Sequence, residues 1–252
     1  MAFILSIDTA VENAGVCLAE DGHTLAFREN SKQKDHASWT HTAILQLLQE
    51  TGLERSALHA VAVTSGPGSY TGLRVGLATA KGLCYALKIP LITENTLRVI
   101  AYAVKSAALE EDFGVKEVKG TEAISRDAQD GDAGSRFLPT LICPMIDARR
   151  MEVFTAVYDT QLQETLKPSA SILEPSSFEE LLAGNNIIFC GNGSGKWRTV
   201  CAHPNARYSN VKYNVKHLSD LAFEKLGRGD FTELAYAEPV YLKNFYTPPQ
   251  SL

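Results

Sequence analysis

The sequence lacks an excess of basic residues. Its 24 lysines and arginines are outnumbered by 29 aspartates and glutamates, which gives a net charge of -5. A protein that binds nucleic acid on its own needs a clustered Lys/Arg surface to replace the counterions of the phosphates. We therefore expect any RNA to be held mainly by a partner protein.

The sequence also lacks the cysteine pattern of a metal or redox site and the apolar run of a membrane segment. The five cysteines are odd in number and form no C-x-x-C pair, which favours buried, reduced thiols. The first residues, MAFILSIDTA, have no basic segment, and their apolar run stops at Asp8. These features predict a cytoplasmic protein without membrane contact.

Motifs of nucleophilic or metal-dependent catalysis are missing as well. There is no G-x-S-x-G or H-E-x-x-H sequence, and His36 and His41 lie about 140° apart on their expected helix. The segment GNGSGKW (191–197) is not a P-loop, because its glycines are too close together and Trp197 stands where Ser or Thr is needed. We predict no catalytic residue and no metal ligand.

A repeated order of elements is present instead. The first half predicts strands at 3–7, 14–19 and 24–28, a helix at 37–50, a strand at 60–64, the loop SGPGSYTG, and a helix to about Lys88. The second half predicts strands at 141–149, 151–159 and 162–166, a capped helix at 176–184, and a strand entering a glycine-rich turn at 186–195. This repetition predicts a duplicated α/β lobe with mixed sheets flanked by helices.

The expected domains follow from this repeat. Residues 1–104 form the first lobe, and residues 139–252 form a smaller second lobe whose C-terminal helix is free to pack back on the first. Between them, 13 of the 34 residues in 105–138 are charged, which is typical of a solvated, flexible insertion.

The two lobes each carry an aspartate at the end of the first strand, Asp8 and Asp147. This arrangement resembles the actin, sugar-kinase and heat-shock ATPase superfamily, in which such aspartates hold nucleotide phosphates and hydrated Mg²⁺. The resemblance implies an actin-like (ribonuclease H-like) fold and makes Asp8, Thr9 and Asp147 candidates for a vestigial phosphate site. Alternatively, each aspartate only caps the turn after its strand.

Four segments in order along the chain resemble the TsaB (formerly YeaZ) family: ILSIDTAVENAGVCL at the start, AVTSGPGSYTGLRVGLATAKGL, PMIDARRMEVFTAVYD, and AEPVYLKN near the end. The resemblance implies a non-catalytic subunit of the system that makes threonylcarbamoyladenosine beside the anticodon of tRNAs reading codons that begin with A. It implies a heterodimer with a TsaD-type transferase, an added TsaE-type ATPase, and tRNA bound through the complex. A homodimer of the isolated chain is an alternative that the sequence leaves open.

TsaD-like proteins carry an H-x-x-x-H metal pair, and the matching positions here are Thr96 and Ile100. A hydroxyl and an aliphatic chain do not replace two imidazoles on a metal. We therefore expect no cofactor on this chain alone, with ATP and a metal used by the complex. The alternative function is an independent ATPase or metalloprotease-like enzyme of the same superfamily.

The resemblance also implies that the partner binds the first two helices. Gly72, Gly76 and Ala80 recur every four residues and form a stripe of small residues on one helix face. The expected interface residues are Ile44, Leu47, Leu48, Gly72, Leu73, Gly76, Leu77 and Ala80. The alternative is close packing of this stripe on the chain's own sheet.

Overall fold

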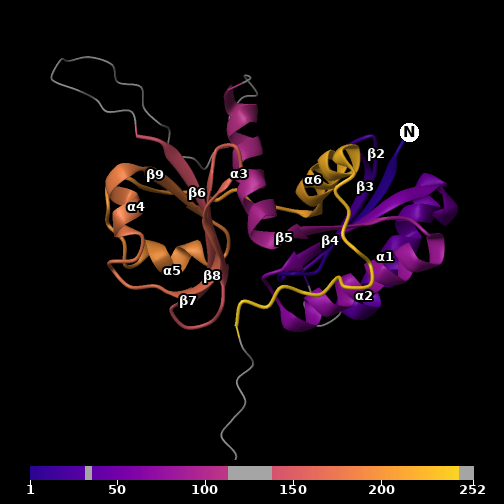
Figure 1. The fold of residues 1–252 in the computed structure, drawn as a ribbon, viewed down its shortest axis with the longest axis horizontal. Coiled ribbons are helices and arrows are strands. Elements are labelled where there is room, and N and C mark those ends of the chain that lie inside the picture. The colour runs from indigo at the N-terminus through magenta and orange to yellow at the C-terminus, as the bar shows by residue number, and fades with distance from the viewer. Residues whose placement is uncertain (32–35, 113–137, 244–252) are drawn as a thin grey trace, which may run out of the picture. The chain divides into compact units, whose positions relative to one another are not determined.

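The computed structural model describes residues 1–31, 36–112 and 138–243, and the side chains of 109–112 are not described. The chain divides into two compact units. The first joins residues 1–99 to the segment that begins at Tyr213, and the second comprises residues 100–212. Each unit contains one five-stranded sheet (Figure 1).

The first unit is built from a sheet with the strand order β3-β2-β1-β4-β5. Its elements are β1 (Phe3–Asp8), β2 (Ala14–Glu20), β3 (His23–Asn30), α1 (His36–Thr51), the 3-10 turn η2 (Arg55–Ala57), β4 (Leu58–Gly66), α2 (Tyr70–Leu87), β5 (Leu91–Asn95) and, near the end, α6 (Val215–Arg228). The pairs β1–β2 and β2–β3 are antiparallel, whereas β1–β4 and β4–β5 are parallel.

Strand β1 shows why this sheet needs helices on both faces. Every residue from Ile4 to Asp8 is buried, so neither face of the strand meets water. Helices α1 and α2 cover one face and α6 covers the other (Figure 1). The approach of α6 is close, because a Cβ atom at Gly15 would lie 2.7 Å from Val215. A mixed sheet buried on both faces is the arrangement expected of an α/β lobe.

The helices of the first unit begin and end at residues suited to those positions. The Ser69 hydroxyl accepts a hydrogen bond from the amide of Gly72 at the start of α2, and Lys88 ends that helix in the left-handed conformation. Asn214 and His217 form a capping box at the start of α6, and Gly229 ends it. Such caps satisfy backbone groups that have no partner within the helix.

The second unit repeats the topology of the first. Its sheet has the order β10-β9-β6-β7-β8, which is the order of the first sheet read in the opposite direction. Its elements are β6 (Thr140–Asp147), β7 (Glu152–Asp159), β8 (Glu164–Ile172), α4 (Glu179–Gly184), β9 (Asn186–Cys190), α5 (Ser194–Arg198) and β10 (Ala206–Tyr208), and α3 (Thr96–Asp112) precedes them. The expected duplicated, actin-like fold is confirmed.

Several boundaries differ from the expected ones. Residues 105–112 of the expected insertion form the end of α3, and 113–137 lie outside the described residues. Helix α6 and the segment after it belong to the first unit, which agrees with a C-terminal helix that packs back on the first lobe, although residues 139–252 as a whole were expected to form the second lobe. The helix expected from residue 176 starts at Glu179, and Phe178 before it makes no side-chain cap.

None of the helices within the described parts of the chain has the length and apolar character needed to cross a lipid bilayer.

Candidate functional site

Asp8, the first phosphate-site candidate, is buried at the end of β1 with 1% of its surface exposed. One carboxylate oxygen accepts hydrogen bonds from the amide of Ala10 at 2.9 Å and from the hydroxyl of Thr64 at 2.8 Å. Burial raises the pKa of Asp8 above its usual value, although these two donors and the nearby Tyr213 hydroxyl act to lower it. The carboxyl group is therefore engaged by its own lobe.

The turn after Asp8 is covered by the start of α2. The hydroxyl of Thr9 donates to the carbonyl of Gly72 at 2.7 Å, and the amide of Ser69 donates to the carbonyl of Ala10 at 2.7 Å. A Cβ atom added at Gly68 would overlap the Ala10 carbonyl. The turn after β1 and the loop before α2 thus contact one another directly, and glycine is required for their close approach.

Asp147, the second candidate, is engaged by a different neighbour. Its carboxylate lies 2.7 Å from the Nζ atom of Lys196 and accepts the amide of Arg149 at 2.6 Å. Partial burial alone would raise the pKa of Asp147, but the hydrogen bond and charge of Lys196, together with the Arg149 amide, lower it below its usual value. Lys196 also donates to the carbonyl of Glu152 at 3.2 Å. Its ammonium group therefore lies beside the Asp147 carboxylate, where a metal cation would otherwise be attracted.

The side chains considered as metal ligands do not come together either. Among the described residues, no three His, Cys, Asp or Glu side chains come together as a ligand set. Thr96 and Ile100 both have buried side chains on α3. His36 is buried with its Nε2 atom 3.2 Å from the carbonyl of Glu12, whereas His41 is exposed, so these two do not share an ion.

The eight residues expected at the partner interface are buried inside the first unit. They are Ile44, Leu47, Leu48, Gly72, Leu73, Gly76, Leu77 and Ala80. A Cβ atom at Gly76 would overlap the Thr9 hydroxyl and lie 3.4 Å from Val63. The stripe of small residues therefore packs on the chain's own strands β1 and β4, which is the alternative that the sequence left open. An interface on these helices has to use their outward sides.

The outward sides of α1 and α2 carry few charged residues, and that of α2 also has small residues. Leu45 on α1 is 49% exposed, and Ala78 and Gly82 on α2 are also exposed. Apart from the adjacent residues and backbone of α2 itself, no heavy atom of the described chain lies within 4 Å of a Cβ built at Gly82. A glycine inside a helix costs about 1 kcal/mol relative to alanine. Nothing in the described lobe requires that small size, unlike at Gly72 or Gly76.

Residues 231–243, here called the strap, run from α6 back over α2. The amide of Thr232 donates to the carbonyl of Leu91 at 2.8 Å, which covers the open edge of β5. The amide of Val240 donates to the carbonyl of Ser65 at 2.7 Å, next to the GPG loop. The AEPVYLKN segment singled out in the sequence thus holds the loop against the lobe.

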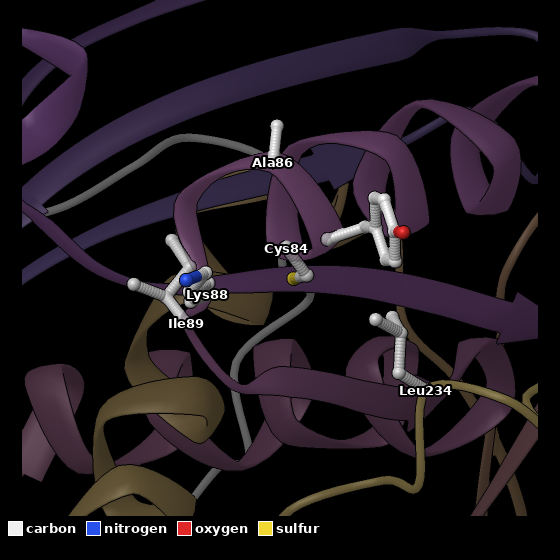
Figure 2. Close-up of a pocket in the computed structure, with 6 residues that line it drawn as sticks. Cys84, Ala86, Lys88, Ile89 and Leu234 are labelled. Carbon is white, nitrogen blue, oxygen red and sulfur yellow. The ribbon is translucent and has the colours of Figure 1, made fainter.

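A surface pocket lies between the strap and the last turn of α2 (Figure 2). Its lining is mostly apolar and comprises Cys84, Tyr85, Ala86, Lys88, Ile89 and Leu234. Burial raises the pKa of Cys84 to about 11, and the thiol donates to the carbonyl of Pro90 at 3.4 Å. The pocket therefore offers an apolar recess with a protonated thiol, not a nucleophile.

Comparison with known proteins assigns the family. The tRNA threonylcarbamoyladenosine biosynthesis protein TsaB of Escherichia coli is 25% identical over 248 residues, covering 96% of this chain and 94% of that relative. Its counterpart in Bacillus subtilis is 27% identical over 192 residues, covering 75% of this chain and 70% of that relative. YeaZ from Pseudomonas aeruginosa superposes with a TM-score of 0.71 at 26% identity, covering 96% and 100% of the two chains. The chain belongs to the TsaB (YeaZ) family.

A relationship of this TsaB-family chain to the transferase is also found. The family model described as TsaD, tRNA N6-adenosine threonylcarbamoyltransferase, matches residues 29–115. The transferase of Carboxydothermus hydrogenoformans is 40% identical over 106 residues, covering 36% of this chain and 32% of that relative. The resemblance inferred from the sequence is confirmed.

The sequence reasoning missed three features of this TsaB-family structure. Lys196 was considered only as part of a rejected P-loop, and its pairing with Asp147 depends on the fold. Gly82 belongs to a second series of small residues on α2, which the spacing from Ala78 could have indicated. Tyr241, at the end of the strap, contacts α2 through the Arg74 side chain at 3.2 Å, across 167 residues of sequence.

Proposed function

We propose that this chain is a non-catalytic subunit of the system that makes threonylcarbamoyladenosine in tRNA, where it binds and activates a TsaD-type transferase as a heterodimer. Membership of the TsaB family supports this role, because the relatives in E. coli and B. subtilis carry that biosynthetic name. In this proposal a TsaE-type ATPase joins the pair, tRNA binds through the complex, and the chain works in the cytoplasm.

The state of the two aspartates supports a non-catalytic role. Asp8 is engaged by Ala10 and Thr64, and Asp147 is paired with Lys196. An ATPase of this fold needs both carboxylates to organise hydrated Mg²⁺ around the phosphates. The proposal therefore assigns ATP and the metal to the partner subunits, and it disfavours an independent ATPase or metalloprotease-like enzyme.

The observation that carries the partner assignment is the open space around Gly82. An exposed glycine in the middle of a helix lowers stability, and close approach of another helix is a physical reason to keep one. Ala78 on the same side of α2 and Leu45 on α1 extend an exposed surface that has few charges. This composition fits the core of a helix-to-helix protein interface. The proposed contact therefore lies on the outward side of α1 and α2 and not on the buried stripe that was expected from the sequence.

The test is binding of a TsaD-type protein from the same organism, measured by calorimetry and gel filtration. Gly82→Leu should weaken binding at least about tenfold, because the added side chain blocks close approach, and should leave the melting temperature nearly unchanged. The matched control is Gly227→Leu, since Gly227 on α6 is also exposed with nothing within 4 Å of a Cβ atom. Normal binding by Gly82→Leu would place the interface elsewhere.

A further inference from the structure

The exposed tyrosines of this chain are gathered in one region. Among the described residues, all tyrosines with large exposed surfaces lie on α2 or on the strap: Tyr70, Tyr85, Tyr236 and Tyr241. The other described tyrosines are buried or half-buried. Tyr85 is 81% exposed and Tyr236 is 78% exposed, which is unusual for aromatic rings on a lobe with a complete core of its own.

Cations follow the same flank of α2. Arg74, Lys81 and Lys88 are spaced seven residues apart, and seven residues of helix make nearly two full turns with a rise of about 10.5 Å. The three side chains therefore form a row along the helix side that faces the strap. Helix α2 itself contains no aspartate or glutamate. This row is positively charged although the whole chain carries a net charge of -5.

At one end of the row, a cation and two aromatic rings are in contact. The Arg74 guanidinium lies 4.1 Å from the centre of the Tyr70 ring and donates to the Tyr241 hydroxyl at 3.2 Å. The Tyr70 and Tyr241 rings have centres 5.2 Å apart. One end of the row is thus a built cluster of two rings and one guanidinium.

The other end of the row has a ring and a cation at the pocket of Figure 2, where Tyr85 and Lys88 both contribute to the lining. Between the two ends, the Nζ atom of Lys81 donates to the carbonyl of Ala237 at 3.0 Å, which fixes its charge on the strap side. We call this surface the tyrosine flank: Tyr70, Arg74, Lys81, Tyr85 and Lys88 with Tyr236 and Tyr241.

The tyrosine flank borders the surface proposed for the transferase. Gly82 lies about 100° around the helix from Lys81, but Ala78 lies only about 40° from Arg74 and about 20° from Tyr85, because each residue of an α-helix turns by about 100°. Arg74, Lys81 and the Tyr70 ring contact the strap, whereas Ala78 and Gly82 face outward. The two proposed surfaces therefore adjoin along α2 and differ in composition.

We propose that the tyrosine flank binds single-stranded RNA, with bases stacking on the tyrosine rings and phosphates contacting the cations. Alternating aromatic and basic groups along a groove or row are the means by which proteins hold unpaired nucleotides. The choice of RNA rests on the proposed function, since an anticodon loop presents unpaired bases. Glu233 and Glu238 on the strap, with the net negative charge, keep the affinity of the isolated chain low.

The experiment titrates the full chain into a labelled RNA hairpin with an unpaired loop, and into a blunt RNA duplex of the same composition. We expect a dissociation constant of about 10–100 µM for the hairpin at about 50 mM salt, with weaker binding of the duplex. Tyr85→Ser should weaken hairpin binding about fivefold or more through the lost stacking. Lys88→Asn, which keeps a residue tolerant of the left-handed conformation, should reduce the slope of affinity against salt by about 0.7.

The matched control is Gly227→Leu on α6, an exposed glycine with nothing within 4 Å of a Cβ atom, which should leave RNA affinity within about twofold of the unchanged chain. The RNA titration contains no partner protein, so its outcome does not depend on transferase binding. Absence of measurable binding, equal binding of hairpin and duplex, or unchanged affinity in both flank variants would overturn the RNA assignment. Loss of a protein partner with intact RNA binding in those variants would make the flank a protein-docking surface instead.

Discussion

The hydroxyl of Thr9 donates a hydrogen bond of 2.7 Å to the carbonyl of Gly72, 63 residues further along the chain. This bond joins the turn after the first strand to the first turn of α2. The same contact explains the glycines at the start of α2, because the helix backbone lies directly on Thr9.

Replacing glycine by alanine should change the free energy of unfolding in opposite directions at Gly72 and Gly82 of α2. Gly72→Ala should lower the free energy of unfolding by more than about 2 kcal/mol, because its Cβ atom would overlap the Thr9 carbonyl. Gly82→Ala should raise it by about 0.5–1 kcal/mol, because the site is open and alanine favours helix. Urea unfolding measures both. A Gly72→Ala variant as stable as the parent would contradict the close packing.

Gly76→Leu provides a related check on the buried stripe. We expect this variant to lose its cooperative unfolding transition or to melt at a much lower temperature, because the side chain would enter the space of Thr9 and Val63. Circular dichroism during heating is sufficient. A stable Gly76→Leu protein that fails only in partner binding would restore the interface first expected from the sequence.

The isolated chain should neither release phosphate from ATP at a useful rate nor retain stoichiometric iron or zinc. The reason is that Asp8 and Asp147 are engaged by protein groups and that the Thr96 and Ile100 side chains are poor metal ligands. A phosphate-release assay and elemental analysis are the measurements. An ATPase activity that Asp8→Ala abolishes would support the independent enzyme instead.

Glu94 should be important for holding α6 on the sheet. This carboxylate is 4% exposed and lies 3.1 Å from Arg98 and 3.2 Å from Lys225 of α6. Glu94→Gln should cost about 2 kcal/mol of stability, less than for a fully buried pair because both cations keep some contact with water. The control is Glu50→Gln in the exposed pair with Arg28, where about 0.5 kcal/mol or less is expected.

Asp220 on α6 should make stability depend on pH. Burial is the main cause that raises its pKa from 3.8 to about 6, with Glu224 adding to the rise and Lys216 opposing it. Between these two values the folded state binds more protons than the unfolded state, so this group lowers stability as pH rises. Asp220→Asn should therefore leave stability unchanged near pH 3 and raise it by about 1 kcal/mol above pH 6, after allowance for partial exposure.

Urea unfolding at a series of pH values gives the Asp220 profile. The gain should appear between about pH 4 and pH 6 and then remain constant. A gain that is the same at every pH would show that the carboxyl group titrates at its ordinary value in the folded lobe, and a gain that is largest at low pH would show that the fold lowers its pKa.

The repeated strand order was predictable because each lobe alternates in the same way between β-branched runs, an aspartate and a glycine-rich turn. Strands β1, β4 and β6 are apolar enough to be recognised individually, and helix α2 has both an N-terminal serine cap and a following proline at 90. Strand β5 and helix α3 were not predicted as elements, because the strand has only five residues and the helix enters the charged segment.

The candidate site was less predictable than the fold. Helical spacing placed Gly72, Gly76 and Ala80 on one side of α2, but it could not tell whether that side faces a partner or the chain's own sheet. That distinction depends on Thr9, which lies in a different segment of the sequence. The pairing of Asp147 with Lys196 likewise joins residues 49 positions apart, and no local pattern encodes it.

The first unit is assembled from both ends of the described chain, residues 1–99 and the segment from Tyr213 onward. During synthesis, residues 100–212 leave the ribosome before α6 and the strap do, a delay of roughly 6–20 seconds at ordinary rates of translation. Until then, one face of the first sheet has no helix and the β5 edge has no cover. The nascent lobe therefore exposes a strand edge and an apolar face that attract chaperones or other unfinished chains.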